Sequence, residues 1–265
     1  RTNNVLTLLL VFQDLTEAQA RAVFEPFLSF VAASPSEYSI EEPIRVVAVP
    51  ARRWWDPDYL AAELPSQITR DPRPGAPPGD IWWAGNQGEV GFFLHGYESA
   101  WLPAHLLSEA ERSRLDAALF AASRHWPVTL HYNKGLAGGP EEAIAAARDT
   151  AMNPAVADAF ALAVVAHGGP PAYLGMPGAV PDLSLARDNA AAIGRAIAIL
   201  RDLVPDAGSY VSEGGFADPH WQRRSFGGNY ERLLAIKQRY DPEGLFTTHH
   251  GVGSEAWSQD GFAPS

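Results

Sequence analysis

The pattern of apolar and polar positions divides the first part of the chain into two candidate strands and one helix. A nearly continuous apolar run from Val5 to Phe12 predicts a strand that is covered on both faces. The sequence Thr16-Glu17-Ala18-Gln19 is typical of a capping box. Apolar residues then recur at helical spacing from Ala20 to Val31, which predicts a helix. A second strand is expected from Ile44 to Val49.

A loop-rich region from Pro50 to Gly88 follows these elements. Six prolines lie between Pro57 and Pro78, and proline interrupts regular structure. After this region, Val90 to His95 predicts a third strand. Ser108-Glu109-Ala110-Glu111 predicts a second capping box that opens a helix.

The second half of the chain continues the alternation of strands and helices. Apolar runs predict strands at Val128–Tyr132 and Phe160–Ala166. The other expected elements are a short helix from Pro140, a long helix from Ala186 to Leu200, an extended piece from Tyr210 to Glu213 and a last helix from Asn229 to Tyr240. Strands separated by helices, with no glycine-rich phosphate loop, predict an α+β fold in which helices cover one face of a sheet.

Composition and charge narrow the classes of function. The net charge of −11 argues against nucleic acid or an anionic membrane as a partner, because phosphate binding needs clustered lysines and arginines. The chain has no cysteine, which excludes disulfides, thiolate metal sites and thiol catalysis within it. No run approaches the roughly 18 apolar residues that cross a bilayer, so no membrane span is expected. No short cluster of metal ligands occurs, so no metal site is expected.

The most informative pattern lies near the C-terminus, where aromatic, glycine and charged residues follow one another at tight spacing. They are Trp221-Gln222, Phe226-Gly227-Gly228-Asn229-Tyr230-Glu231-Arg232-Leu233, Ile236-Lys237, Tyr240-Asp241-Pro242, Leu245-Phe246 and the tail from Gly251 to Trp257. This order resembles the closing signature of flavin oxidases of the berberine bridge enzyme family. Upstream segments also resemble its bacterial and fungal branch: 131–138, 153–156 and 208–213. Ser212 stands where that family usually has Asn, which weakens the transfer of individual residue roles.

The resemblance implies a bipartite flavoprotein of the vanillyl-alcohol-oxidase type. One half binds FAD through a glycine-rich domain, and a His, often with a Cys, attaches the flavin covalently. The other half is an α+β substrate domain, an antiparallel sheet covered by helices on one face. The chain resembles this second half. Residues 1–207 are expected to form the substrate-binding domain, and residues 208–265 the C-terminal segment that packs against the FAD-binding domain.

The glycine-rich FAD-binding sequence does not occur in these 265 residues, and the chain begins with Arg1 rather than Met. We therefore expect a cleaved precursor or a heterodimer in which a second polypeptide binds most of the FAD. The compartment stays open, and a soluble protein that is secreted or periplasmic after processing is one option.

The resemblance also implies an oxidase. A hydride would leave an alcohol, sugar or amine carbon, and the electrons would pass to dioxygen to give hydrogen peroxide. The alternative is a non-catalytic ligand-binding subunit that kept the fold and lost flavin chemistry. The absence of the FAD-binding half makes this alternative a serious one.

Four residues of the C-terminal segment are the main site candidates. Tyr210 is the candidate catalytic base, since removal of a hydride also requires a proton acceptor. Glu213 would hold this base or orient the substrate. By resemblance, Asn229 would hydrogen-bond the flavin and Tyr230 would pack beside it. The competing interpretations are a packing tyrosine at 210, a solvated strand end at 213, a helix cap at 229 and a core tyrosine at 230.

His131, Lys134 and His167 are weaker candidates for lining the substrate. Lys134 follows a predicted strand in a glycine-bounded turn, where its charge could lower the pKa of a nearby tyrosine. An ordinary structural hydrogen bond is the competing role for each of the three. Two tryptophan pairs in the proline-rich region, Trp54-Trp55 and Trp82-Trp83, are interpreted as anchors for long loops rather than as a ligand platform.

Overall fold

The fold comes from a computed structural model that describes residues 4–173, 175–258 and 263. The described residues form two compact units that divide between Val90 and Gly91. The functional boundary expected between residues 207 and 208 stays a prediction. None of the helices described is long and apolar enough to cross a membrane.

The N-terminal unit is built from short elements around a small core. They are α1 (Glu17–Val23), α2 (Glu25–Ala33), α3 (Pro57–Glu63), β1 (Ile68–Arg70) and β2 (Ile81–Trp83), with two short 3-10 helices at 51–53 and 84–88. β1 and β2 pair in antiparallel fashion, and Leu60, Leu64 and Ile68 are buried beside them. The ring of Trp54 lies 5.3 Å from that of Trp83, so these two side chains fasten the proline-rich segment to the small sheet.

Two of the predicted strands in this unit are wrong. Residues 5–12 and 44–49 form no strand, and Leu9 and Val11 are 89% and 87% exposed. A strand needs a paired neighbour for its backbone groups, and among the described residues neither run has one. The capping box at Thr16 is confirmed, because its side chain and that of Gln19 cap each other's backbone. The expected helix is interrupted at Phe24, just before Pro26 near the start of α2.

The proline-rich region also contains more regular structure than predicted. α3 begins at Pro57, a position that tolerates proline because the first helical N–H needs no intrahelical partner. Asp56 caps this helix by accepting a hydrogen bond from the Tyr59 N–H.

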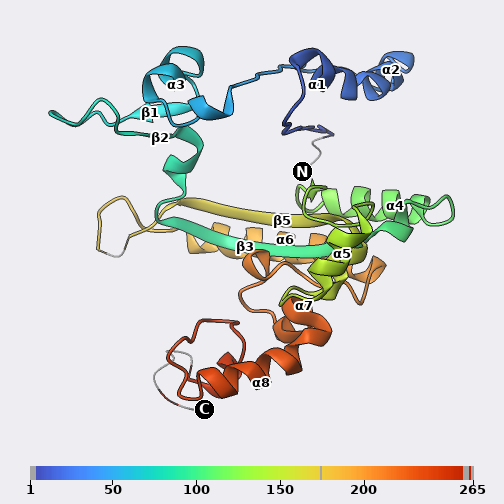
Figure 1. Cartoon of the computed structure of the whole chain (residues 1–265), viewed down its shortest axis with the longest axis vertical. Helices are drawn as coiled ribbons and strands as arrows, with labels where there is room; N and C mark the ends of the chain where they lie inside the picture. The colour runs from blue at the N-terminus through green and yellow to red at the C-terminus, as the bar shows by residue number, and fades with distance from the viewer. Residues whose placement is uncertain (1–3, 174, 259–262, 264–265) are drawn as a thin grey trace. The chain divides into compact units, whose positions relative to one another are not determined.

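The C-terminal unit is built on an antiparallel sheet with the strand order β3-β5-β4. Its strands are β3 (Phe92–Pro103), β4 (Thr129–His131) and β5 (Ala159–Pro171). β3 and β5 pair over almost their full lengths, and Figure 1 shows these two long strands side by side. All three strands were predicted, although β3 and β5 continue beyond the apolar runs that indicated them.

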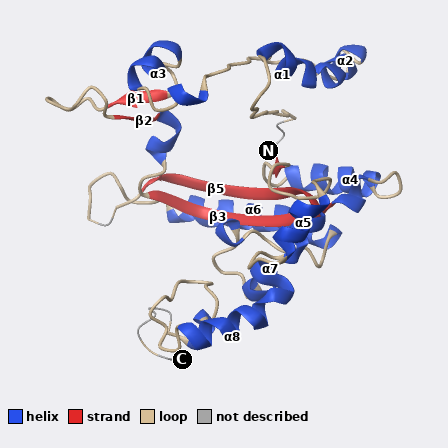
Figure 2. Cartoon of the chain, viewed as in Figure 1, coloured by secondary structure: helices blue, strands red, loops and turns tan. Residues whose placement is uncertain are grey.

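Helices cover one face of this sheet. α6 (Leu183–Leu203) packs against β3 and β5, and α4 (Arg112–Ser123) packs against α6 (Figure 2). Ala100, Leu102, Ala163 and Val165 point from the strands into this core, where they meet buried side chains of α6 such as Leu200. The α+β class with an antiparallel sheet and helices on one face is confirmed.

The remaining helices belong to connections and to the C-terminal segment. They are α5 (Glu141–Arg148), α7 (Trp221–Phe226) and α8 (Tyr230–Tyr240), with short 3-10 helices between them. The predicted capping box at Ser108 is wrong. Its backbone N–H closes a 3-10 turn by bonding to the His105 carbonyl, and α4 begins later, at Arg112. The extended piece expected from Tyr210 to Glu213 is also wrong, since residues 211–213 form a 3-10 helix and only Tyr210 is extended.

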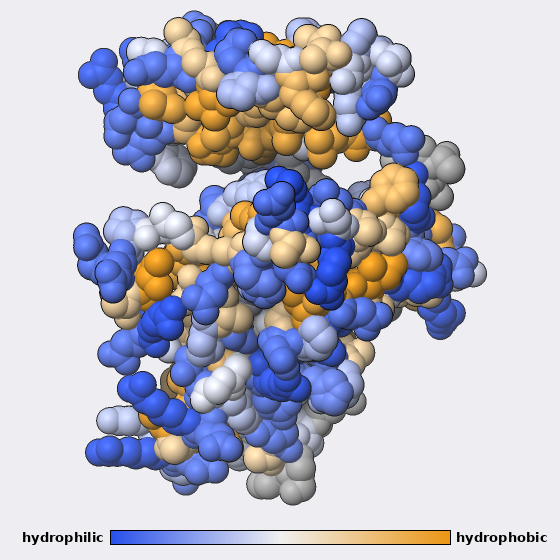
Figure 3. Space-filling model, turned by 90° about the vertical axis from the view of Figure 1, so that its right-hand side faces the viewer, coloured by the Kyte–Doolittle hydropathy of each residue, from blue (hydrophilic) through white to orange (hydrophobic). Residues whose placement is uncertain are grey.

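The alternation of β3 separates two groups of side chains. Gly96, Ala100 and Leu102 face α6, and a Cβ on Gly96 would lie 3.2 Å from Ile193 of that helix. From Tyr97 to Trp101 the odd positions point to the opposite face, where Trp101 packs with Val156, Leu162 and Val164. A register shift between Leu94 and Gly96 puts His95 on the α6 side instead. This second face carries the polar side chains described below. Large apolar side chains also remain exposed on both units, and Figure 3 shows several apolar areas on the face in view.

The packing of α6 predicts the effect of one substitution. Leu200 is fully buried, so Leu200→Ala should lower the free energy of unfolding by about 2–5 kcal/mol through lost burial and a residual cavity. Leu185→Ala, in the same helix but at a side chain that is 50% exposed, should change it by no more than about 0.5 kcal/mol. Urea unfolding of the two variants measures the difference. Equal losses would contradict the orientation of α6.

Candidate functional site

The segment from Gly208 to Tyr210 lies along the free edge of β3. The backbone N–H of Trp101 donates to the Gly208 carbonyl at 3.0 Å. Ser99, which is completely buried, accepts at its hydroxyl from the Tyr210 N–H at 3.1 Å and at its carbonyl from the Ser209 hydroxyl at 3.0 Å. These bonds hold Tyr210 over the face of the sheet that helix α6 leaves uncovered.

Glu213 joins three segments that are distant in the sequence. Its Oε1 accepts a hydrogen bond from the Tyr97 hydroxyl at 3.1 Å, and its Oε2 accepts one from Lys134 Nζ at 2.6 Å. The Lys134 and Glu213 side chains are only 27% and 15% exposed, so solvent screens this ion pair less than an exposed one. We call Tyr97, Lys134, Tyr210 and Glu213 the Glu213 cluster.

Lys134 contacts both the Glu213 carboxylate and the ring of Tyr210. Its Nζ lies 4.9 Å from the centre of that ring, within the range of a cation–π interaction. The loop that carries Lys134 is fixed on β5, because the N–H groups of Leu136 and Ala137 donate to the carbonyls of Val156 and Ala159. Gly135 allows this close approach, since a Cβ there would meet the Ala159 oxygen at 2.2 Å.

Tyr97 is the member of the cluster that sequence reasoning missed. Burial, together with the adjacent Glu213 carboxylate, raises the pKa of Tyr97 to about 12. Tyr97 is therefore a proton donor to Glu213 at neutral pH and does not serve as a base. The predicted strand stopped at His95. The alternation of Tyr97, Ser99 and Trp101 with Glu98 and Ala100 was the signal that could have placed Tyr97 on the face of Trp101. The register shift at His95 interrupts this alternation, so it does not follow from the predicted strand.

The side chain of Asn153 fastens the C-terminal segment to the sheet. Its Nδ2 donates to the Arg224 carbonyl at 2.7 Å, and its Oδ1 accepts from the Ala155 N–H at 2.9 Å. The same Arg224 carbonyl accepts from the Ser209 N–H at 2.7 Å. A Cβ on Gly208 would lie 2.0 Å from Asn153 Nδ2, so only glycine fits beside the amide.

The structure separates the two candidate histidines. His131 pairs with Leu162 across the sheet and therefore lies on the same face as the Glu213 cluster. His167 pairs with Gly96 and belongs to the opposite face. There its ring lies 5.3 Å from His95 and 5.1 Å from Trp126, and His95 in turn contacts Asn189 of α6 at 3.0 Å. The structure thus brings Tyr210, Glu213 and Lys134 together and leaves His167 outside this group.

Asn229 and Tyr230 lie at the start of α8 and make structural contacts. Asn229 Nδ2 donates to the carbonyls of Met152 at 2.8 Å and Thr150 at 3.2 Å, and its side chain does not cap the helix. Tyr230 donates its hydroxyl proton to Glu255 and accepts from the Gly253 N–H. Burial and the Glu255 carboxylate raise the pKa of Tyr230 to about 12. The amide oxygen of Asn229 is the atom through which it could accept a hydrogen bond from a ligand.

A stack of rings holds the tail of the chain against α7. His249 and His250 stack at 3.8 Å between centroids, and His250 also stacks on Trp221 at 5.1 Å. Burial and the neighbouring His249 lower the pKa of His250. Within the described part of the chain, no three His, Asp or Glu side chains converge as they would around a metal ion.

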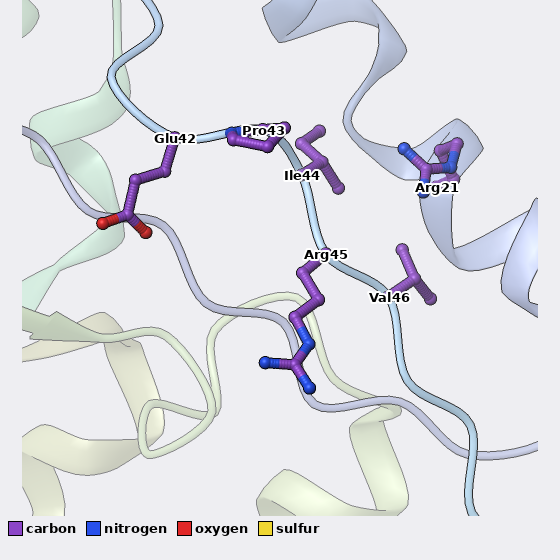
Figure 4. Close-up of a pocket in the computed structure, with 6 residues that line it drawn as sticks. All are labelled: Arg21, Glu42, Pro43, Ile44, Arg45 and Val46. Atoms are coloured by element: carbon purple, nitrogen blue, oxygen red, sulfur yellow. The ribbon is translucent and has the colours of Figure 1, made fainter. Parts of the chain in front are cut away.

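Two cavities, one in each unit, differ in their size and in the side chains that line them. A broad hollow of about 540 Å³ in the N-terminal unit lies beside Arg21 and the extended segment 42–46. Figure 4 shows that the Glu42 and Arg45 side chains there point away from those of Ile44 and Val46, so no polar groups converge on a ligand. A smaller cavity of about 140 Å³ lies beside Trp101 and Tyr210. Ligand pockets usually measure about 300–1,000 Å³, so this smaller cavity does not hold a dinucleotide such as FAD.

The two tyrosine–glutamate contacts give a matched pair of variants. Glu213→Gln should lower the pKa of Tyr97 from about 12, because it removes the adjacent negative charge, while burial keeps this pKa above the usual 10. Glu255→Gln should do the same for Tyr230. NMR titration of the tyrosine Cζ signals, assigned with Tyr97→Phe and Tyr230→Phe, measures both values. If either variant shifted both tyrosines, the assigned contacts would be wrong.

Known proteins match the C-terminal part of the chain most clearly. The family model described as "Berberine and berberine like" matches residues 199–253. An uncharacterized FAD-linked oxidoreductase of Arthroderma benhamiae is 45% identical over 65 residues, which cover 24% of this chain and 11% of that protein. The VAO-type flavoprotein oxidase VAO615 of Thermothelomyces thermophilus is 37% identical over 83 residues, or 31% and 14% of the two chains.

Two solved structures share the fold. The VAO-type flavoprotein MtVAO615 from Myceliophthora thermophila superposes with a TM-score of 0.55 at 20% identity, covering 92% of this chain and 38% of that one. MtVAO713 from the same organism gives a TM-score of 0.50 at 19% identity, covering 68% and 31%. The chain thus spans well under half the length of these flavoproteins. Residues 199–253 thus match the C-terminal segment described as berberine and berberine-like, and this stretch is similar to FAD-linked oxidoreductases.

Proposed function

We propose that this chain is the substrate-domain part of an FAD-dependent oxidase. The observation that carries the proposal is the Glu213 cluster, a half-buried group of titratable side chains on the uncovered face of the sheet. Groups of this kind in a shielded setting are typical of catalytic sites. The segment that contributes Tyr210 and Glu213 lies within the stretch that matches the berberine and berberine-like family.

FAD would be held mainly by a domain outside these 265 residues. The cavity beside Trp101 and Tyr210 measures about 140 Å³, which is too small for the whole cofactor, so these residues would meet only part of it. The names of the relatives, which describe FAD-linked proteins, support this assignment. When bound, FAD would supply the hydride acceptor and the route by which electrons reach dioxygen. The family resemblance adds covalent attachment of the flavin in that other domain.

The FAD-binding domain would cover apolar surface of the C-terminal segment. Tyr240, Leu245 and Phe246 are 74%, 80% and 79% exposed on the chain described here. Apolar side chains so close together mark a surface that another protein surface covers. This domain is encoded either in the same precursor or on a second chain, and both arrangements leave the same surface to be covered.

In the reaction, Tyr210 takes the proton from the substrate hydroxyl or amine. Lys134 Nζ lies 4.9 Å from the centre of the Tyr210 ring and holds this ring in place through a cation–π interaction. Glu213 holds Lys134 in this place through their ion pair, and Tyr97 fixes the other oxygen of the carboxylate. Lys134, Glu213 and Tyr97 are thus positioning residues. Substrates of the expected kind are alcohols, sugars or amines, and His131 on the same face would line their site.

The variant Tyr210→Phe tests this role in the FAD-loaded protein. It should slow flavin reduction by substrate about 10²- to 10⁴-fold, the usual contribution of a general base, and should leave the visible flavin absorption unchanged. Anaerobic stopped-flow bleaching of the flavin with alcohols, sugars and amines measures the rate. Tyr38→Phe, at a tyrosine of the N-terminal unit that is 45% exposed, is the matched control and should react as the wild type does.

An unchanged rate in Tyr210→Phe would remove this residue from the mechanism. A native protein without flavin absorption that still binds sugars or aromatic compounds would favour a non-catalytic ligand-binding subunit instead.

A further inference from the structure

The segment from Glu213 to Gly215 crosses the free edge of strand β3. Tyr97 and Glu98 are neighbours in this strand, so their side chains point to opposite faces of the sheet. Tyr97 bonds to Glu213 on the face that carries Tyr210. Glu98 lies on the face that α6 covers, and there its carboxylate lies against Gly215. One strand therefore holds two residues of this segment, each from a different face.

The carboxylate of Glu98 is fixed by an arginine of α6. Arg201 Nη2 donates to Glu98 Oε2 at 2.7 Å, and the two side chains are only 20% and 21% exposed. Solvent screens such an ion pair less than an exposed one. Gly215 is buried against the other carboxylate oxygen, since a Cβ on this glycine would lie 2.4 Å from Oε1. The space beside Gly215 is thus limited by a charged group that is not free to turn away.

The segment that follows Gly215 is held as well. The N–H of Asp218 donates to the Gly215 carbonyl at 3.2 Å, and the Asp218 carboxylate accepts from Arg224 Nη1 at 2.6 Å. Burial would raise the pKa of Asp218, but hydrogen bonds from Arg224 and from the His220 N–H outweigh burial and lower this pKa. The positive charge of Arg201 acts in the same direction, so Arg201 lies near both Glu98 and this carboxylate.

We propose that Glu98, held by Arg201, is a positioning residue that fixes the place of Glu213 from the opposite face of β3. Only one residue separates Glu213 from Gly215, so a shift of the backbone at Gly215 would move the Glu213 carboxylate away from its partners. The contacts stand on their own geometry. Their consequence for catalysis rests on the proposed function, in which Glu213 holds Lys134.

Two neighbouring glycines provide a matched pair of variants. A Cβ on Gly214 would have its nearest neighbour, a backbone oxygen, at 3.6 Å, so Gly214→Ala should leave the segment in place. A Cβ on Gly215 would meet Glu98 at 2.4 Å, so Gly215→Ala should displace the segment as long as Arg201 holds the carboxylate. Neither glycine has a positive φ, so alanine meets no backbone strain at either position.

The pKa of Tyr97 depends on how close the Glu213 carboxylate lies, whether or not the protein turns over a substrate. NMR titration of the FAD-loaded protein should give about 12 in the wild type and in Gly214→Ala. In Gly215→Ala the pKa should fall toward the value of Glu213→Gln. Flavin reduction by substrate should also slow about 10- to 100-fold in Gly215→Ala, since a displacement of about 1 Å can cost about 100-fold.

Further variants test the ion pair itself. Arg201→Met frees the Glu98 carboxylate and should lower the pKa of Tyr97. Arg148→Met removes an exposed ion pair with Asp158 and should leave that pKa at the wild-type value. In Glu98→Ala/Gly215→Ala the alanine methyl meets no carboxylate, so the pKa should return toward the wild-type value.

Melting temperatures show whether each variant folds. A Tyr97 pKa that is unchanged in Gly215→Ala or in Arg201→Met, an equal fall in Gly214→Ala, or no recovery in the double variant would each overturn the proposal.

Flavin reduction separates this inference from the proposed function. If the pKa of Tyr97 falls as described while flavin reduction keeps its rate, the positioning by Glu98 stands and the proposed role of Glu213 in catalysis fails. If flavin reduction slows in Gly215→Ala while the pKa of Tyr97 stays at the wild-type value, the oxidase stands and the inference is wrong.

Discussion

The position of the whole site depends on the amide of one buried asparagine. Asn153 bonds to the Arg224 carbonyl, and the same carbonyl receives the Ser209 N–H, so three distant segments meet at one oxygen. From this point Tyr210 continues along β3, and Glu213 reaches Lys134. A buried amide that lost its partners would cost about 1–3 kcal/mol, which makes the junction selective for one arrangement. Gly208 and Gly227 leave the space that the amide occupies, since a Cβ on either would lie within 3 Å of it.

Elements of the fold were predictable where the sequence determines them locally. Thr16 and Gln19 form a cap within four residues, and α6 shows a long apolar stripe, so both were found from the sequence. The run from Val5 to Phe12 has the composition of a buried strand, yet strand formation also requires a partner that a local pattern does not reveal. Ser108 has the residues of a cap, but its N–H is used by the preceding 3-10 turn.

The site was predictable in part for a similar reason. Tyr210, Glu213 and Lys134 were chosen by motif and by residue type, and the structure brings the three together. Tyr97 was not predicted as a site residue, because its contact with Glu213 spans 116 positions of sequence and no local pattern links two residues so far apart. His167 looked equivalent to His131 at the end of an apolar run. Successive side chains of a strand lie on opposite faces of the sheet. The register of strand pairing therefore determines the face on which each histidine lies, and the local sequence does not show this register.

Strand β3 also has a consequence for how such a protein can diversify. Its positions Gly96, Ala100 and Leu102 meet the helix-covered core, and Tyr97 and Trp101 lie on the face that carries Tyr210. A change at Ala100 or Leu102 therefore acts on the packing between the sheet and α6, whereas a change at Tyr97 acts on the contacts of Glu213. Within one strand of twelve residues, neighbouring positions therefore differ in what a substitution disturbs first, the helix-covered core or the side chains around Glu213.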